Sequence, residues 1–143
     1  MIYNSTKVIV LGSTAFRQPK AKSHCRYIHG YNLYAKFYFE SDELDENNWV
    51  VDFGSLKRLK NALRDDFDHK LVLSKSDPFL EDFKELHKKG VVDLRILDEI
   101  SIEMFAEYCC NMANKMLGKS KAKCVMVEVF EHEKNSGIYK VKN

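Results

Sequence analysis

The chain has 143 residues, of which 45% are apolar and 31% are charged, and its formal net charge is +2. This length and composition exclude a disordered chain and favour a single domain over residues 1–143 with a sizeable core. The nearly balanced charge argues against a phosphate-binding surface, so no nucleic-acid partner is expected. The longest uncharged stretch near the N-terminus is too short to cross a bilayer and lacks the basic start of a signal peptide. We therefore expect a cytoplasmic protein without a membrane partner.

Two strands are predicted in the first third of the chain. Residues 6–16 are rich in β-branched side chains, which favour extended backbone. Residues 31–40 carry apolar side chains at every second position, as in a strand that is buried on one face. The polar segment between them, residues 17–30, contains a proline and a glycine and is predicted to be a loop.

The middle of the chain is predicted to hold two helices and two short strands. Leucines at helical spacing indicate a helix over residues 55–66, with Ser55 as its N-cap. A proline begins and a glycine ends an amphipathic helix over residues 78–89. The apolar runs at residues 70–75 and 91–97 are predicted to be short strands.

The last third of the chain predicts a long helix followed by a hairpin. An apolar stripe runs along residues 101–117, and Ser101 is placed to cap that helix. Residues 122–131 and 137–142 are predicted strands joined by a segment with the composition of a hairpin turn. Both strand pairs resemble hairpins, and the order of elements contains no strand–helix–strand repeat of the parallel type. We therefore predict an antiparallel α+β fold.

Three of the four cysteines are predicted to be buried thiols. Cys109 and Cys110 lie in the apolar helical pattern, and Cys124 lies in a predicted strand. A disulfide framework is not expected in a chain of this size with this core. Cys25 differs, because it lies in a polar, basic loop where a thiol has no packing role.

Other titratable side chains could act together with Cys25. They are His29 in the same loop, the adjacent pair Asp68 and His69, and Glu131 near the last turn. A thiol, an imidazole and a carboxylate are the parts of a proton-transfer or nucleophilic site. Spacing alone does not bring these residues together, because any chain of this length contains such side chains.

Five short motifs follow one another along the chain. The loop sequence CRYIHGYN, at residues 25–32, has the form Cys-x-x-x-His-Gly-x-Asn. The other four are VVDF at residues 50–53, FDHK at 67–70, SIEMFA at 101–106 and VFE at 129–131, with Tyr139 in the following strand. In this order the set resembles the 6-pyruvoyl-tetrahydropterin synthase and 6-carboxytetrahydropterin synthase family over nearly the whole chain.

The resemblance implies the tunnelling fold, or T-fold, in which a four-stranded antiparallel sheet carries two long helices on one face. Three such subunits close a barrel, which removes the open edges of the sheet, and two trimers stack into a hexamer. A homo-oligomer, either trimer or hexamer, is therefore expected. The resemblance also implies a lyase that converts 7,8-dihydroneopterin triphosphate or a related pterin to a 6-pyruvoyl- or 6-carboxytetrahydropterin.

The same resemblance gives roles to the candidate catalytic residues. Cys25, Asp68 and His69 match the catalytic cysteine, aspartate and histidine of the family. In this scheme Asp68 orients His69, and the cysteine–histidine pair moves protons at the side chain of the substrate.

The candidate substrate-binding residues are Glu131, Glu103 and Ser101. Glu131 matches the residue that holds the pterin in this family. The physical reason for a glutamate there is that a carboxylate accepts two parallel hydrogen bonds from a 2-amino-pyrimidinone edge. A surface ion pair at a strand end is the alternative. Ser101 and Glu103 match positions near the pterin pocket, and their alternative is an N-cap followed by an acidic first turn.

The zinc site of the family is held by three histidines, and this chain departs from that pattern. Phe16 and Tyr31 stand at two of the three positions, so that only His29 remains. Phenylalanine cannot ligate a metal and neutral tyrosine is a poor ligand, which puts zinc binding in doubt. The substitute ligands that could restore the site are His24, Cys25 and His132.

Three hypotheses follow from these residues. The first is an enzyme of this family whose zinc is replaced or rearranged. The second is a metal-free T-fold enzyme, since the nitrile reductases of queuosine synthesis and dihydroneopterin aldolase share the fold and work without a metal. The third is a non-catalytic oligomer that binds a pterin or a guanine-like ligand, or that only assembles.

Overall fold

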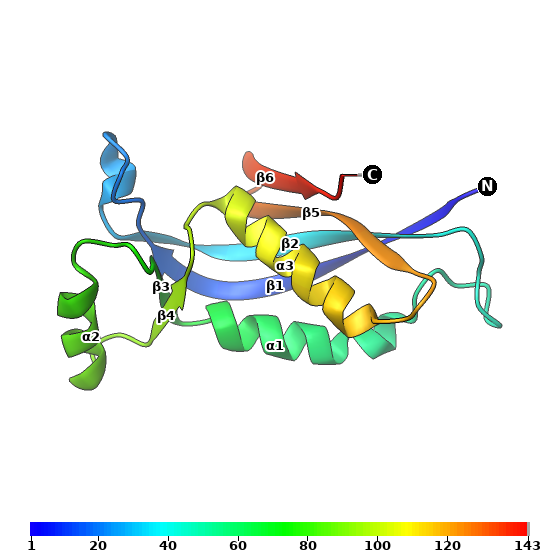
Figure 1. Cartoon of the computed structure of the whole chain (residues 1–143), viewed down its shortest axis with the longest axis horizontal. Coiled ribbons are helices and arrows are strands. Elements are labelled where there is room, and N and C mark those ends of the chain that lie inside the picture. The colour runs from blue at the N-terminus through cyan, green and yellow to red at the C-terminus, as the bar shows by residue number, and fades with distance from the viewer. Residues whose placement is uncertain (143) are drawn as a thin grey trace.

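The structure is a computed structural model that describes residues 1–142. Within these residues, six strands form one curved sheet that three α-helices accompany (Figure 1). The strands are β1 (Tyr3–Phe16), β2 (His29–Ser41), β3 (Lys70–Ser74), β4 (Leu94–Leu97), β5 (Lys123–His132) and β6 (Asn135–Lys140). The helices are α1 (Lys57–Phe67), α2 (Leu80–Lys88) and α3 (Ile102–Leu117), with short 3-10 turns η1 (His24–Arg26) and η2 (Phe53–Leu56).

The strand order across the sheet is β4-β3-β1-β2-β5-β6. Strands β1, β2, β5 and β6 are joined in antiparallel fashion, which confirms the two predicted strand pairs. Strand β3 joins the end of β1 in parallel, and β4 joins β3 in parallel. The expected four-stranded antiparallel sheet is therefore present, but two further strands extend it. The expectation that no parallel strand–helix–strand unit occurs is wrong, because β3, α2 and β4 form one.

The short strands were predicted as elements, but their place in the sheet was not. A run such as KLVLS at residues 70–74 indicates a buried strand without indicating its partner or direction, and four of its five residues are buried. The segment from β3 to β4 contains α2 and is long enough for the crossover connection that parallel neighbours need. The sheet therefore gains a parallel extension beside β1.

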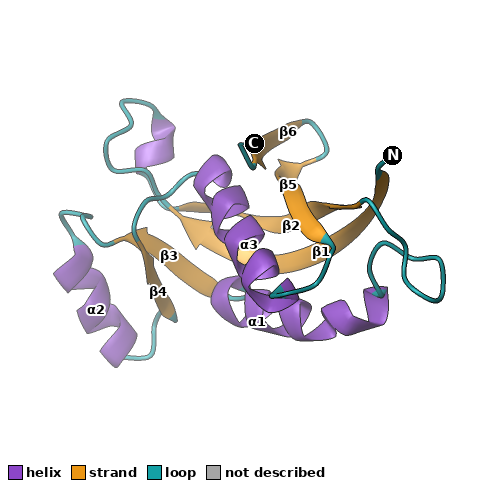
Figure 2. Ribbon diagram, turned by 45° about the vertical axis from the view of Figure 1, so that its right-hand side comes forward, coloured by secondary structure: helices purple, strands orange, loops and turns teal. Residues whose placement is uncertain are grey.

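Helices α1 and α3 lie on the same face of the sheet, whereas α2 lies beside β4 (Figure 2). This confirms the expected pair of helices on one face. Ser101 caps α3 as predicted, because its hydroxyl accepts a hydrogen bond from the N–H of Met104 at 3.0 Å. Ser55 does not cap α1, because it lies inside η2, and it is Asp52 that caps this turn.

The hydrophobic core fills the space between the sheet and helices α1 and α3. Phe105 of α3 lies at its centre, with its ring centroid 5.3 Å from both Phe16 of β1 and Phe67 of α1. The three cysteines predicted to be core thiols are buried there without a disulfide: Cys109, Cys110 and Cys124. None of the helices in residues 1–142 is long and apolar enough to cross a membrane.

Candidate functional site

A row of rings lies where β1 ends and β2 begins, close to the start of α3. Phe16 is paired with His29, and Thr14 with Tyr31, across the two strands. Directly opposite residues of an antiparallel pair share a face. Because Phe16 packs on Phe105 of α3, all these side chains are on the helix-bearing face. The ring of His29 lies 4.8 Å from that of Phe16 and 5.8 Å from that of Tyr31.

Two acidic side chains and the loop thiol surround this row. Burial raises the pKa of the Tyr31 hydroxyl, and Coulombic interactions with the Glu131 and Cys25 side chains raise it further. Glu131 and Cys25 are therefore close enough to act on the same phenol. On the neighbouring strand, a Cβ built on Gly137 would lie 3.1 Å from the carboxyl carbon of Glu103. Gly137 thus leaves room for the carboxylate at the start of α3.

Near Tyr31 the structure brings together residues that were predicted for three different roles: the catalytic Cys25, the metal ligand His29 and the substrate-binding Glu131. Glu103 lies over Gly137, which pairs with Val129 two residues before Glu131. The hydroxyl of Ser101 accepts a hydrogen bond from the N–H of Met104 and so caps the N-terminus of α3. Its alternative reading as an N-cap therefore holds, and its part in substrate binding remains a prediction.

The donor set at this position does not fit the three-histidine zinc site of the resembled family. Phe16 is 1% exposed and belongs to the core, so its ring fills a position where a ligand would stand. The Nδ1 of His29 hydrogen-bonds to the carbonyl oxygen of Tyr27 at 2.8 Å, which leaves one imidazole nitrogen for a ligand. Among residues 1–142 no three His, Cys, Asp or Glu side chains lie close enough together to hold a metal ion. The substitute ligands His24, Cys25 and His132 therefore do not form such a group either.

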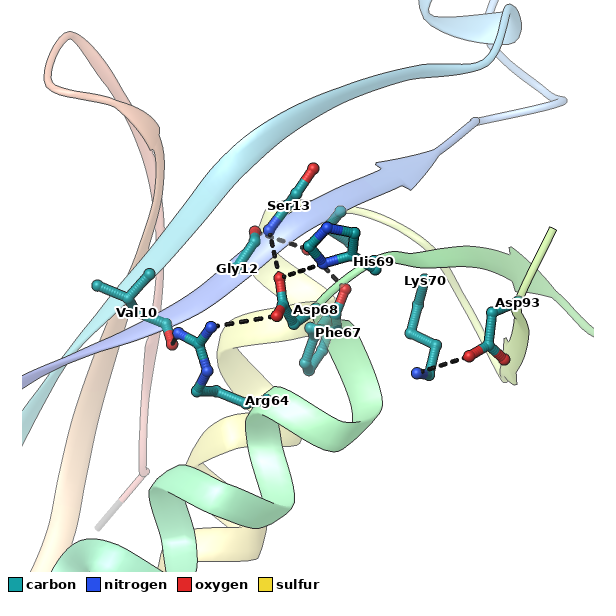
Figure 3. A network of polar contacts seen from close by, with 10 residues as sticks. Val10, Gly12, Ser13, Arg64, Phe67, Asp68, His69, Lys70 and Asp93 are labelled. Carbon is teal, nitrogen blue, oxygen red and sulfur yellow. Dashed lines mark hydrogen bonds and ion pairs between the residues drawn. The ribbon is translucent and has the colours of Figure 1, made fainter.

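Asp68 and His69 form a second cluster at the end of α1 (Figure 3). One carboxylate oxygen of Asp68 accepts the N–H of Ser13 at 3.0 Å and lies 3.0 Å from Nδ1 of His69. The other oxygen accepts a hydrogen bond from Arg64 at 3.1 Å. The carboxylate can approach β1 because Gly12 has no side chain, since a Cβ there would lie 2.2 Å from it.

These contacts hold Asp68 in its ionised form. Partial burial alone would raise the pKa of its carboxyl group. The hydrogen bonds from Ser13 and His69, together with the positive charges of His69 and Arg64, outweigh that effect and lower the pKa below its ordinary value. Asp68 lies within hydrogen-bond distance of the imidazole of His69, and the orienting role that the resemblance implies for it stays a prediction.

His69 has a backbone conformation that only a minority of non-glycine residues adopt. Its φ angle is +59°, and its N–H is bound to the carbonyl oxygen of Ser13. Such left-handed residues are costly and concentrate at functional positions. His69 directly follows the C-cap of α1, a position where left-handed residues are common, and its imidazole is 84% exposed.

The Cys25 cluster and the imidazole of His69 lie on opposite faces of β1. His69 borders a shallow hollow together with Ser13 and Ala15. These residues alternate along the strand with Thr14 and Phe16, whose side chains point to the helices, so they point to the other face. One chain therefore carries the Cys25 cluster on one face and the imidazole of His69 on the other.

Sequence reasoning missed two residues that build the second cluster. Arg64 stands four residues before Asp68, and this helical spacing was a signal that the two side chains could meet. Gly12 interrupts a β-branched run, which is a known mark of a bulge or of a close backbone approach. The pairing of β1 with β2 shifts register between Val10 and Gly12.

Comparison with known proteins gives a consistent result. Residues 13–142 match the family model described as 6-pyruvoyl tetrahydropterin synthase. Two curated relatives are the 6-carboxy-5,6,7,8-tetrahydropterin synthases of Aquifex aeolicus, 27% identical over 74 residues, and Rickettsia bellii, 35% identical over 57 residues. Those matches cover 52% and 39% of this chain, and 46% and 41% of the relatives, so the match spans less than half the length of each relative.

Solved structures resemble the chain over its whole length. An uncharacterized protein from Wolinella succinogenes superposes with a TM-score of 0.85 at 17% identity and 99% coverage of both chains. The 6-pyruvoyl tetrahydropterin synthase of Plasmodium vivax superposes with a TM-score of 0.70 at 15% identity, again with 99% coverage of both chains. At these identities the likeness concerns the fold, and it confirms the expected α+β fold of the T-fold type.

The contacts of Asp68 predict a specific pH dependence of stability. A carboxyl group whose pKa is lowered by folding stabilises the fold above its unfolded pKa of about 3.9, and this contribution is lost as the pH falls through the folded pKa. The stability difference between the parent and Asp68→Asn should therefore be fully present at about pH 5 and shrink below about pH 4. Urea unfolding at a series of pH values measures it, with Asp65→Asn on the same helix as control. A difference that stays constant down to about pH 3 would contradict this account.

The aromatic row predicts that a zinc site can be restored. Histidines in place of Phe16 and Tyr31 would stand beside His29, where the present ring spacings allow three imidazoles to converge on one ion. The double variant Phe16→His with Tyr31→His should purify with about one zinc per subunit, and the parent with much less. Elemental analysis after growth with zinc measures this. A metal-free double variant that is folded by circular dichroism would mean that these positions are not the ligand positions.

Proposed function

This chain belongs to the 6-pyruvoyl tetrahydropterin synthase family, and we propose that it binds 7,8-dihydroneopterin triphosphate or a related pterin. In this proposal Glu131 holds the ring, and Cys25 and His69 move protons at the substrate's side chain without the three-histidine zinc of the family. The observation that supports it is the row formed by the rings of His29, Tyr31 and His132, the last of which directly follows Glu131, with Glu131 and Cys25 near enough to Tyr31 to raise its pKa.

Glu131 is the residue best placed to recognise the ring. It is half-buried, and no hydrogen bond or ion pair to another residue within residues 1–142 engages its carboxylate. Its two oxygens are therefore free to accept hydrogen bonds from a ligand. The two parallel N–H groups of a 2-amino-pyrimidinone edge would supply charge-assisted hydrogen bonds to them.

The chemistry proposed here is proton transfer by side chains. Cys25 supplies a thiol in a loop that is partly exposed, and Tyr31, whose pKa is raised, stays protonated at neutral pH and can donate a hydrogen bond. His69, oriented by Asp68, supplies the exchangeable proton that a thiol–imidazole pair needs. The resident donor set does not fit zinc, and no step in this scheme uses a metal.

The opposite orientation of the two clusters supports a site shared between copies of the chain. In this proposal His69 of one copy acts with the Cys25 cluster of another copy, because within one chain its imidazole borders the face of β1 away from that cluster. The sheet also offers surfaces for assembly. Strand β1 pairs with β3 only through Thr14–Phe16, and its face away from the helices exposes Val8 and Val10. We propose a homo-oligomer, a trimer or a hexamer, that closes these edges and faces.

A second candidate is a non-catalytic oligomer that binds a pterin or guanine-like ring. The observation that favours it is the replacement of two metal-ligand positions by Phe16, which is part of the core, and Tyr31. Turnover separates the two candidates, because only the first predicts conversion of a pterin that depends on Cys25.

The ring-binding role predicts the effect of Glu131→Gln. The amide keeps the size of the side chain but loses the charge, and it can accept only one of the two hydrogen bonds, so pterin affinity should fall by about 10- to 100-fold. Isothermal calorimetry with dihydroneopterin measures it. Glu133→Gln, at an exposed position of the following turn, is the matched control. Equal affinity for the parent and Glu131→Gln, with an unchanged oligomer, would reject Glu131 as the ring-binding residue.

The shared site predicts complementation between inactive variants. Cys25→Ala and His69→Ala should each be inactive alone, because each removes one half of every site. When the two proteins are unfolded together and refolded, mixed oligomers contain some sites with both halves intact, so part of the activity should return. Pterin turnover before and after mixing measures this. Activity that stays absent in oligomers shown by mass spectrometry to be mixed would place both residues in one chain's site.

A further inference from the structure

The loop that carries Cys25 is not held in place by apolar packing. Its 3-10 turn, η1, contains no buried residue. Hydrogen bonds close the loop instead. The N–H of Gln18 donates to the carbonyl oxygen of Cys25 at 2.9 Å, and the Nε of Arg17 donates to the carbonyl oxygen of Arg26 at 2.8 Å. The position of the thiol therefore depends on the residues that follow β1.

Arg17 is itself fixed by a buried ion pair. One of its terminal nitrogens donates to both carboxylate oxygens of Asp77, at 2.8 and 3.1 Å. The side chain of Asp77 has no exposed surface and that of Arg17 is 12% exposed. The guanidinium also lies over the ring of Phe79, 5.5 Å from its centroid. A charge pair this buried holds one geometry, because either partner left alone would be an unpaired charge in the protein interior.

Asp77 in turn is held by the connection between β3 and α2. Its N–H donates to the carbonyl oxygen of Ser74, the last residue of β3, and its carboxylate accepts the N–H of Phe79 just before α2. One guanidinium thus ties together the end of β1, the Cys25 loop and the β3–α2 turn. The parallel extension of the sheet, which the sequence did not reveal, is what provides this anchor.

We propose that Arg17, oriented by Asp77, is the positioning residue for the thiol of Cys25. This inference rests on the catalytic role proposed for Cys25. It requires an arginine rather than any cation, because two different nitrogens of one planar group bind the Asp77 carboxylate and the Arg26 carbonyl at the same time. A lysine could keep the pair with Asp77 but could not also reach Arg26.

The variant Arg17→Lys separates the ion pair from the contact to the loop. We expect amide exchange in residues 18–27 to become about tenfold faster while the melting temperature stays near that of the parent. We also expect iodoacetamide to alkylate Cys25 faster. The reaction is specific in the folded protein because the other three cysteines are buried. In turnover of a pterin substrate, kcat should fall by about tenfold with KM unchanged, because Glu131 lies on β5 and does not depend on Arg17.

The matched control is Glu81→Gln, which breaks an exposed ion pair with Lys84 on α2 and should change none of these quantities. Asp77→Asn, which removes the charge that orients Arg17, should accelerate exchange in the same segment. Unchanged exchange and alkylation in folded Arg17→Lys would overturn the positioning role. Changed exchange and alkylation in a protein whose parent converts no pterin would uphold it and reject the proposed activity. If kcat and KM change together, Arg17 acts on binding and the inference is wrong.

Discussion

The last three residues of β1 are bonded to neighbouring strands on both sides, and the arrangement of the candidate site follows from this pairing. On one side, Thr14 and Phe16 face Tyr31 and His29 of β2. On the other side, the same residues pair with the start of β3, directly after Asp68 and His69. The backbone hydrogen bonds of one short segment therefore fix where both groups of functional side chains stand. Because successive side chains of a strand point to opposite faces, the same pairing places the Cys25 cluster and the imidazole of His69 on different faces of the sheet.

Much of this arrangement could be predicted from the sequence, since local patterns encode local structure. The alternation in β2, the apolar stripe of α3 and the cap at Ser101 are properties of neighbouring residues, and each was predicted correctly. The assignment of Cys25, His29 and Glu131 to one site came from the resemblance of ordered motifs rather than from spacing, and their roles stay predictions. Spacing could not have brought together residues separated by about a hundred positions in the chain.

The parts that could not be predicted depend on partners that are distant in the chain. The parallel pairing of β3 with β1 depends on tertiary packing. The sequence of a five-residue strand does not indicate whether it pairs in parallel or antiparallel fashion. For the same reason the pair between Arg17 and Asp77 was not predicted, because these residues are 60 positions apart and meet only when β3 joins the sheet. The misplaced cap at Ser55 is a local error of another kind, in which a 3-10 turn capped by Asp52 precedes the helix.

Phe16 belongs to the core and to the candidate site at the same time, so a metal ligand cannot be placed there without changing the core. A change from phenylalanine to histidine would place a polar imidazole against Phe105 in the core. Without a metal to bind, such a buried polar group costs on the order of 1–3 kcal/mol, in addition to the lost packing of the larger ring. With Tyr31 still in place the metal would have too few ligands to offset this cost. A single histidine at position 16 would therefore lower the stability of the fold without creating a metal site, and only a simultaneous change at both positions could offset the cost.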